Sequence, residues 1–281
     1  MAKVALITGA SSGFGLLTSV TLARRGWRVL ATMRDLGRSG LLADAARAAG
    51  VVNSIEIHQL DVTKAEQIAA IAELAASRQE PIHALVNNAG FAVPGFAEDV
   101  TDAELREQFD TNFFGAAAVT RAILPQMRRQ GAGHIVMVAS VSGRSGFPGV
   151  SSYAASKFAL EGWTETLRFE MKALGIHVVL VEPGSFATDI WTRNAKVSAR
   201  MRDPDAPNAA RLSRWREKLE QDDKKANPQI VADRIAAILE NPNPKFRYVI
   251  GSDARMALLF RAMLPWSVFE RTMVKLSGID S

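Results

Sequence analysis

For most of its length the chain alternates short apolar runs with longer amphipathic segments. The short runs predict buried strands, and the longer segments, in which apolar residues recur every three or four positions, predict helices. Because the two kinds alternate, we expect β-α-β units, a parallel sheet with helices on both faces, and so a doubly wound α/β fold. The predicted strands span residues 4–8, 28–33, 55–61, 84–87, 134–140, 177–182 and 247–250, and the predicted helices about 14–25, 38–49, 64–78, 102–130, 153–174 and 228–240.

The tail, about residues 254–277, lies outside this alternation. Met256, Leu259, Phe260 and Met263 recur there at helical spacing, and the pattern continues past Pro265. The segment is too interrupted to span a membrane. We expect a packed terminal helix or a dimer surface; a pocket wall for an apolar substrate and, at most, a weak peripheral membrane contact are the alternatives.

Composition narrows the class of protein. The 281 residues, 48% of them hydrophobic, suit one large α/β domain or two small ones with a sizeable core, and because no linker is found we predict one domain. The net charge of +5 favours an anionic cofactor, but basic residues are interleaved with acids, so we expect no nucleic-acid partner. Cysteine is absent and the four histidines are isolated, so no disulfide or metal site is expected. The N-terminus enters the fold without room for a cleavable leader, which predicts a cytoplasmic protein.

Tyr153 and Lys157 stand four residues apart at the start of a predicted helix, so both side chains project from one face. An adjacent ammonium favours the phenolate, so the pKa of Tyr153 should lie below that of a free tyrosine, and the group could exchange a proton. On its own the pair better fits a solvated helix face.

A glycine-rich turn, TGASSGFG, follows the first predicted strand and precedes the first helix. Missing side chains at Gly9, Gly13 and Gly15 allow a tight turn and a close backbone approach to a pyrophosphate. The helix N-terminus then points its free N–H groups at the negative charge. The turn therefore predicts a dinucleotide site.

Six motifs occur in one order at compatible spacing: TGASSGFG, NNAG, DTNFFG, VAS, YAASK and PGSFAT. Together they resemble the short-chain dehydrogenase/reductase superfamily over about residues 3–190. TGASSGFG followed by VLATMRDL is most similar to the branch that acts on steroids, retinoids and other lipophilic carbonyls or alcohols. The resemblance implies strand order 3-2-1-4-5-6-7 in a seven-stranded sheet. It also implies a homodimer or homotetramer formed through the long helices at 102–130 and 153–174.

By this resemblance, residues 191–226 form a helical substrate lid over the active site; a plain surface insertion is the alternative. Tyr153 is then the proton donor, and Lys157 lowers the pKa of Tyr153 and holds the nicotinamide ribose. Ser140 binds the substrate oxygen, and Asn112 organises a water that connects Lys157 to solvent. Besides Tyr153 and Lys157, the implied cofactor contacts are Gly9, Ser11, Ser12, Gly13, Phe14, Gly15, Arg34, Asp61, Val62, Asn88, Ala89, Gly90, Pro183, Gly184 and Thr188.

Cofactor preference depends on the end of the second strand. Asp35 lies 20 residues beyond Gly15, the offset of an acid that binds the ribose 2′-hydroxyl of NAD(H). If the strand ends at Met33, however, the usual acidic position is apolar and Arg34 follows it, as in relatives that prefer NADP(H). We therefore predict NADP(H), with Ser12 as a further donor to the 2′-phosphate, and keep NAD(H) as the alternative.

The motifs predict an oxidoreductase that moves a hydride between nicotinamide and a lipophilic ketone, aldehyde or secondary alcohol. Apolar residues near the motif loops suit such a pocket, although many could be core: Phe91, Val93, Phe96, Phe147, Pro148, Val150, Phe186, Ile190 and Trp191. A reductase of carrier-bound acyl chains is a second hypothesis. A catalytically silent dinucleotide sensor is a third, disfavoured because the proton donor, its cation and the oxyanion donor are all present.

Overall fold

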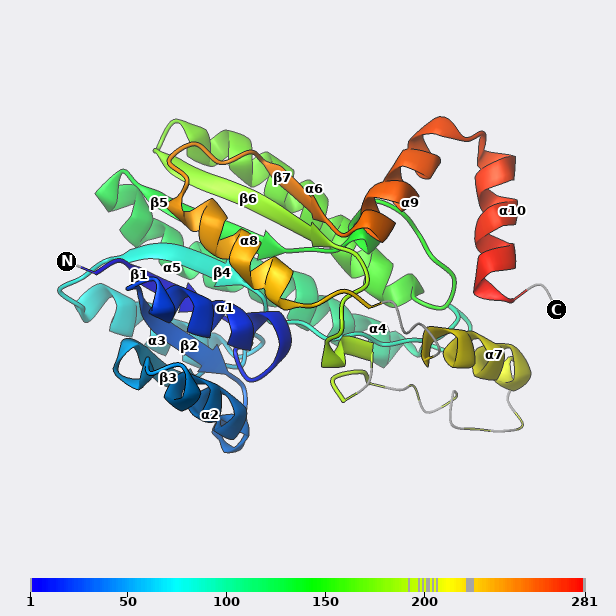
Figure 1. Cartoon of the computed structure of the whole chain (residues 1–281), viewed down its shortest axis with the longest axis horizontal. Helices are drawn as coiled ribbons and strands as arrows, with labels where there is room; N and C mark the ends of the chain where they lie inside the picture. Colours follow the sequence, from blue (N-terminus) through cyan, green and yellow to red (C-terminus); the bar gives the residue numbers. More distant parts are fainter. Residues whose placement is uncertain are drawn as a thin grey trace.

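The computed structural model contains one parallel seven-stranded sheet in the order β3-β2-β1-β4-β5-β6-β7 (Figure 1). The structure describes residues 2–191, 193–196, 198, 200, 203, 205, 207–220 and 225–279. The strands are β1 (Val4–Ile7), β2 (Arg28–Met33), β3 (Ile55–Gln59), β4 (Ile82–Asn87), β5 (Gly133–Val138), β6 (Ile176–Pro183) and β7 (Arg247–Ile250). All seven predicted strands and their order are confirmed.

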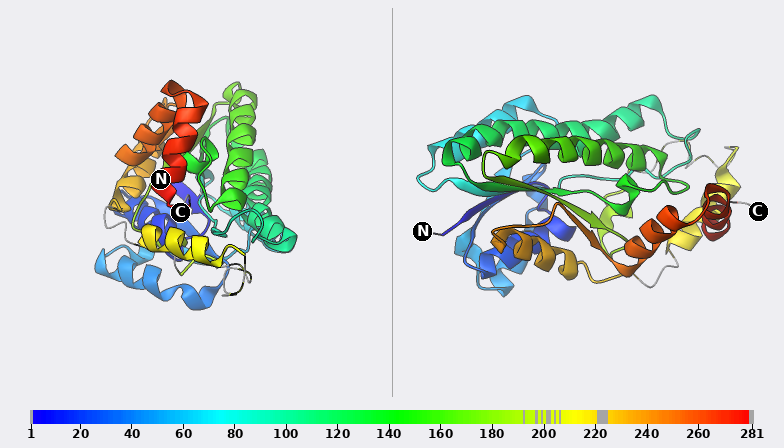
Figure 2. Two further views of the ribbon diagram at one scale, coloured as in Figure 1. Left: turned by 90° about the vertical axis from the view of Figure 1, so that its right-hand side faces the viewer. Right: turned by 90° about the horizontal axis from the view of Figure 1, so that it is seen from above.

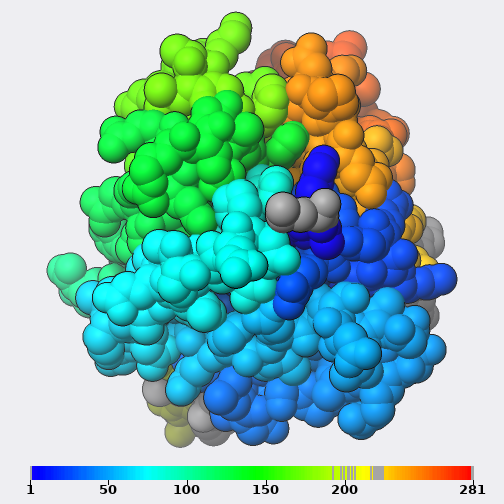
Figure 3. Space-filling model, turned by 90° about the vertical axis from the view of Figure 1, so that its left-hand side faces the viewer, coloured from blue at the N-terminus to red at the C-terminus, as the bar shows by residue number. Residues whose placement is uncertain are grey.

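Helices cover both faces of the sheet, which Figure 2 shows as layers above and below it. One face carries α1 (Gly13–Arg24), α2 (Gly40–Ala48) and α8 (Gln229–Glu240). The other carries α3 (Ala65–Ser77), α5 (Ala116–Gln130) and α6 (Ser151–Lys172). Seen from the end that bears the N-terminus, the first residues come to the surface beside α8 (Figure 3).

Alternate residues of β1 pack into two separate cores. Ala5 and Ile7 join the core under α1 and α8, whereas Val4 and Leu6 join the core under α3, α5 and α6. Successive strand side chains point to opposite faces, and both faces of this strand are covered, so β1 is apolar at every position rather than at alternate ones. This explains the continuous apolar runs in the sequence.

The helix predicted over 102–130 contains a π-helical turn. It consists of α4 (Asp102–Phe109), the π segment Asp110–Gly115 and α5. A Cβ at Gly115 would lie 2.6 Å from Cγ2 of Val62, so this segment packs tightly against the loop after β3. π-Helical turns inside α-helices are frequent at functional sites, and this one carries Asn112.

The tail and the insertion differ in detail from the sequence pattern. The tail forms two helices, α9 (Ser252–Met263) and α10 (Trp266–Ser277), because Pro265 lacks the N–H that would continue the first one. The insertion contains α7 (Ala209–Glu220), with Leu212 and Trp215 buried. Part of the predicted lid, including residues 197, 199 and 221–224, lies outside the described residues.

Candidate active site

A pocket of about 900 Å³ lies at the carboxyl edge of the sheet. Parallel strands bring the loops after β1, β2, β4, β5 and β6 to this edge, where doubly wound folds bind ligands. One end is polar and includes Ser12 and Arg38, which both hydrogen-bond Asn194, together with Arg34 of the segment that leads to Arg38. The other end is aromatic and includes Phe147, Trp191 and Trp215, which pack together around the buried Tyr153.

The glycine turn is built for a close backbone approach. Gly9 and Gly13 adopt φ values of +69° and +54°, which residues with a Cβ rarely adopt. A Cβ at Gly15 would lie 2.4 Å from the Gly9 carbonyl oxygen, so only glycine fits there. The side-chain amide of Asn88 supports the turn from β4 by donating to the carbonyls of Thr8 and Gly9, each at 3.0 Å. The first turn of α1 carries no acid, so its N–H groups are available to an anion.

The end of β2 holds the residues on which cofactor preference was predicted to depend. The strand ends at Met33, and Arg34, Asp35 and Arg38 all line the pocket. Asp35 accepts a 2.9 Å hydrogen bond from the backbone N–H of Gly37 and thereby caps the short 3-10 helix Leu36–Arg38. One carboxylate oxygen of Asp35, the acid at NAD-type spacing, therefore already accepts a hydrogen bond from the local turn.

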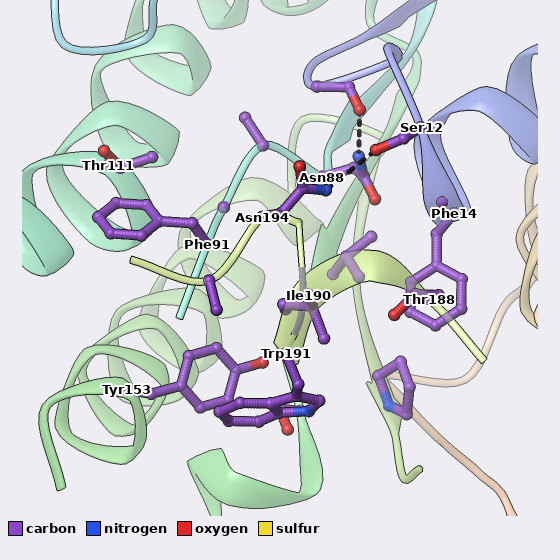
Figure 4. Close-up of a pocket in the computed structure, with 18 of the residues that line it drawn as sticks. Ser12, Phe14, Asn88, Phe91, Thr111, Tyr153, Thr188, Ile190, Trp191 and Asn194 are labelled. Carbon is purple, nitrogen blue, oxygen red and sulfur yellow. Dashed lines mark hydrogen bonds between the residues drawn. The ribbon is translucent and has the colours of Figure 1, made fainter. Parts of the chain in front are cut away.

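Tyr153 lies on the first turn of α6, where its ring packs edge-on against Trp191, with ring centroids 5.3 Å apart (Figure 4). Trp191 comes from the loop after β6, so a side chain of the predicted lid covers the predicted proton donor. Ser140 follows β5 and has only 8% of its surface exposed. Its hydrogen bond to Tyr153 lowers the pKa of the phenol, but burial outweighs it and raises that pKa to about 12.

The predicted lowering of the Tyr153 pKa is wrong for this structure, because burial raises that pKa. Lys157 donates a 2.8 Å hydrogen bond from Nζ to the carbonyl of Val138, and the same Nζ lies 5.7 Å from the centroid of the Tyr153 ring. Burial lowers the pKa of Lys157 itself to about 8, with Glu161 opposing the shift. The physical reason is that Tyr153 is buried, which disfavours the charged phenolate, while the ammonium donates to a backbone oxygen. Tyr153 is therefore a neutral phenol at pH 7, the form that donates a proton.

Asn112 is buried beneath the pocket and does not line it. Its Nδ2 donates to the carbonyl of Phe91 at 3.1 Å and to Oγ of Ser156 at 3.2 Å, and its Oδ1 accepts from the N–H of Phe91. The amide therefore ties the π segment to the loop after β4 and to α6. The predicted water link to Lys157 remains a prediction.

The structure brings nearly all predicted site residues together. Every one lines the pocket except Asn112 and Gly15, which shapes the turn from behind. Among the predicted apolar lining residues, Val93 and Phe96 are also outside the pocket wall. Val93 is fully buried, and Phe96 stacks under the guanidinium of Arg211 at 4.9 Å.

Several pocket residues were not predicted as site residues, and three of them come from segments without a recognisable motif. Asn194 bridges the two sides of the polar end: it donates to Oγ of Ser12 at 3.0 Å and accepts from Arg38 at 3.1 Å (Figure 4). Trp215 of α7 packs on Gly149, where a Cβ would lie 2.6 Å from the indole. Asp253, at the start of α9, accepts from the N–H of Ser185 at 2.6 Å. The resemblance predicted a lid over residues 191–226, but it did not indicate which of its side chains would line the pocket.

A doubly wound sheet, a glycine turn at the first helix and a Tyr–Lys–Ser cluster in one pocket define a dinucleotide-dependent oxidoreductase site. The family model for short chain dehydrogenases matches residues 3–198, and the chain belongs to this family. Its sequence is 42% identical to the uncharacterized oxidoreductase YusZ of Bacillus subtilis, over 97% of this chain and 98% of that protein. It is 43% identical to retinol dehydrogenase 8 of Bos taurus over 66% of this chain, but that match covers only 60% of the retinol dehydrogenase.

Solved structures agree with the fold. A short-chain dehydrogenase from Streptomyces avermitilis superposes with a TM-score of 0.82 and 32% identity, covering 99% of this chain and 98% of its own. A short chain dehydrogenase from Burkholderia cenocepacia in complex with NADP superposes with a TM-score of 0.76 and 25% identity, covering 96% and 97%. The family match and these neighbours make the chain an oxidoreductase with structural relatives that bind NADP.

Proposed function

We propose that the chain transfers a hydride between NADP(H) and a lipophilic ketone, aldehyde or secondary alcohol. The observation that carries this proposal is the single pocket with a polar, cationic end at Ser12, Arg34 and Arg38 and an aromatic end at Phe147, Trp191 and Trp215. The polar end suits the phosphates of a dinucleotide and the aromatic end suits an apolar substrate. Tyr153 lies in the wall of the same pocket.

The residues of the chain divide the chemistry among them. A bound dihydronicotinamide supplies the hydride. In reduction, Tyr153 Oη donates its proton to the carbonyl oxygen, and the Ser140 hydroxyl stabilises the charge that develops there. Trp191 excludes water from Tyr153. Lys157 and Asn112 are proposed as the ribose-holding cation and the positioning amide.

The other candidates have less support. A reductase of carrier-bound acyl chains would need cations that dock an acidic carrier, but Arg193 is paired with Asp189 and Lys196 with Glu107, and Arg34 and Arg38 line the end that suits the dinucleotide phosphates. A silent sensor would not need Tyr153, Ser140 and Lys157 gathered in one wall. Consumption of NADPH, followed by absorbance against a panel of short polar and long apolar carbonyls, tests the proposal. Turnover confined to polar carbonyls, or none at all, would refute it.

Replacing Arg34 with alanine is expected to lower kcat/KM for NADPH by about 10- to 100-fold, the worth of one charged hydrogen bond to a phosphate, and to leave that for NADH unchanged. The ratio of the two efficiencies is the measurement. Arg47→Ala is the control, because Arg47 is an exposed arginine whose partner is Asp44 on the same helix. An unchanged ratio in Arg34→Ala would show that this arginine does not read the 2′-phosphate.

The reduction rate should fall as the pH rises through about 8. Burial has lowered the pKa of Lys157 to about 8, so the side chain is cationic below that pH and neutral above it. A neutral Lys157 binds the ribose hydroxyls less tightly than the ammonium does, and it has one proton fewer to supply to the site. The pH profile of kcat/KM for carbonyl reduction measures this, and a flat profile between about pH 7 and 9 would contradict it.

A further inference from the structure

The two C-terminal helices, α9 and α10, form an arm that stands away from the sheet and its covering helices (Figure 1). Both helices are described in full, and each buries a single residue, Ala254 in α9 and Phe269 in α10. Large apolar side chains are exposed along the arm at Met256, Leu259, Phe260, Met263, Trp266, Val268 and Leu276. A surface so apolar on one short segment marks an interaction site.

The apolar face of α9 points away from the body of the protein. Met256, Leu259, Phe260 and Met263 have 50%, 51%, 40% and 71% of their surfaces exposed. They are spaced as one helix face, and at about 100° per residue Ala254 falls on the opposite side. The side of α9 that carries Ala254 is therefore the buried side. The side that carries the large apolar residues faces solvent.

The arm as a whole carries more cations than acids. Arg255, Arg261, Arg271 and Lys275 outnumber Asp253 and Glu270, and Asp253 is engaged by the N–H of Ser185. The guanidinium of Arg261 lies 4.8 Å from the ring centroid of Trp266. Exposed tryptophan, exposed apolar residues and an excess of cations are typical of helices that lie in the plane of a membrane surface.

We propose that this arm binds the surface of a bilayer containing anionic lipid, with the Met256, Leu259, Phe260 and Met263 face in the acyl boundary. No helix among the described residues is long and apolar enough to cross a membrane, so the contact is peripheral. The arm begins at the pocket, because Asp253 and Gly184 both line it. A lipid-dissolved substrate would thus meet the enzyme beside its site.

The charges favour a lipid surface over a second copy of this chain. In a two-fold pairing each arm meets an identical one, so the excess of cations on one arm would face the same excess on the other. An anionic bilayer complements that excess. Self-association through the arm is the competing outcome of the experiment.

The full-length chain should sediment with vesicles of phosphatidylcholine and phosphatidylglycerol, and sediment less with phosphatidylcholine alone or at high salt. Leu259→Glu and Met263→Glu should weaken the binding at least about tenfold, because each places a charge in the acyl boundary. Val52→Glu is the matched control: Val52 is 50% exposed but lies next to β3, and its variant should bind as the parent does. Thermal unfolding of each variant verifies that it is folded.

Tryptophan emission locates the contact. Brominated lipid in the same vesicles should quench part of the emission, and Trp266→Phe should remove most of that quenching. The proposal is overturned if vesicles bind none of the folded proteins, if Val52→Glu weakens binding as much as Met263→Glu, or if quenching persists without Trp266. A second result also overturns it: the parent protein binds no vesicles, and Met263→Glu changes the oligomeric state in the absence of lipid. The arm would then pair with a second copy of the chain.

Discussion

Tyr153→Phe is expected to lower kcat for carbonyl reduction by about a thousandfold, within the range for loss of a general acid. The phenol is buried against Trp191 and its pKa is raised to about 12, so at pH 7 it carries the proton that the substrate oxygen needs. Phenylalanine keeps the ring and its packing and removes only that proton. The Kd for NADPH, measured by fluorescence titration, should stay within about twofold of the parent, because the glycine turn is untouched.

The chain supplies its own control for this experiment. Its only other tyrosine is Tyr248 on β7, whose hydroxyl accepts a 3.0 Å hydrogen bond from the N–H of Lys245 outside the pocket. Tyr248→Phe removes the same atom at a remote place and should keep full activity. Normal turnover by Tyr153→Phe would rule out Tyr153 as the proton donor and leave the family membership standing.

The sheet was predictable because a strand covered on both faces must be apolar throughout, and such runs survive in the sequence at β1, β5 and β6. Most of the pocket was predictable for a related reason. Parallel strands end at one edge, so motifs that follow strands, such as the glycine turn and Ser140, had to meet there.

What the sequence could not predict depends on side-chain orientation and long-range contacts. Spacing put Tyr153 and Lys157 on one helix face, but it did not show that Nζ would turn to Val138. Nor did it reveal Asn194, whose partners lie more than 150 residues away in sequence. The tail pattern correctly predicted helical structure. Periodicity does not show, however, whether the apolar face of a helix packs on the protein or faces solvent, and that of α9 faces solvent.

A buried ionic cluster one helical turn beyond Lys157 also depends on long-range contacts, and no sequence motif predicted it. Arg247 of β7 contacts Glu161 and Glu165 of α6, and it donates to Glu182 of β6 at 2.9 Å. Arg144, after β5, donates to the other oxygen of Glu182 at 3.1 Å. The side chain of Glu182 is fully buried and that of Glu161 is 6% exposed. Burial, together with Glu182, raises the pKa of Glu161 to about 7, and Arg247 opposes that shift.

Arg247→Ala is therefore expected to lower the free energy of unfolding by about 3 kcal/mol at pH 8, because it removes the ion-pair partner of the buried Glu161 and leaves Glu182 with Arg144 alone. Arg25→Ala, which breaks the exposed pair with Glu240, should cost less than about 1 kcal/mol. The defect must depend on pH. Without Arg247 the folded-state pKa of Glu161 rises further above its unfolded value near 4.5, so stability falls as the pH rises toward and through that higher value, and the defect is smallest near pH 5. Urea unfolding at about pH 5 and 8 measures both quantities, and a defect equal at the two pH values would mean that Arg247 acts by packing rather than by charge.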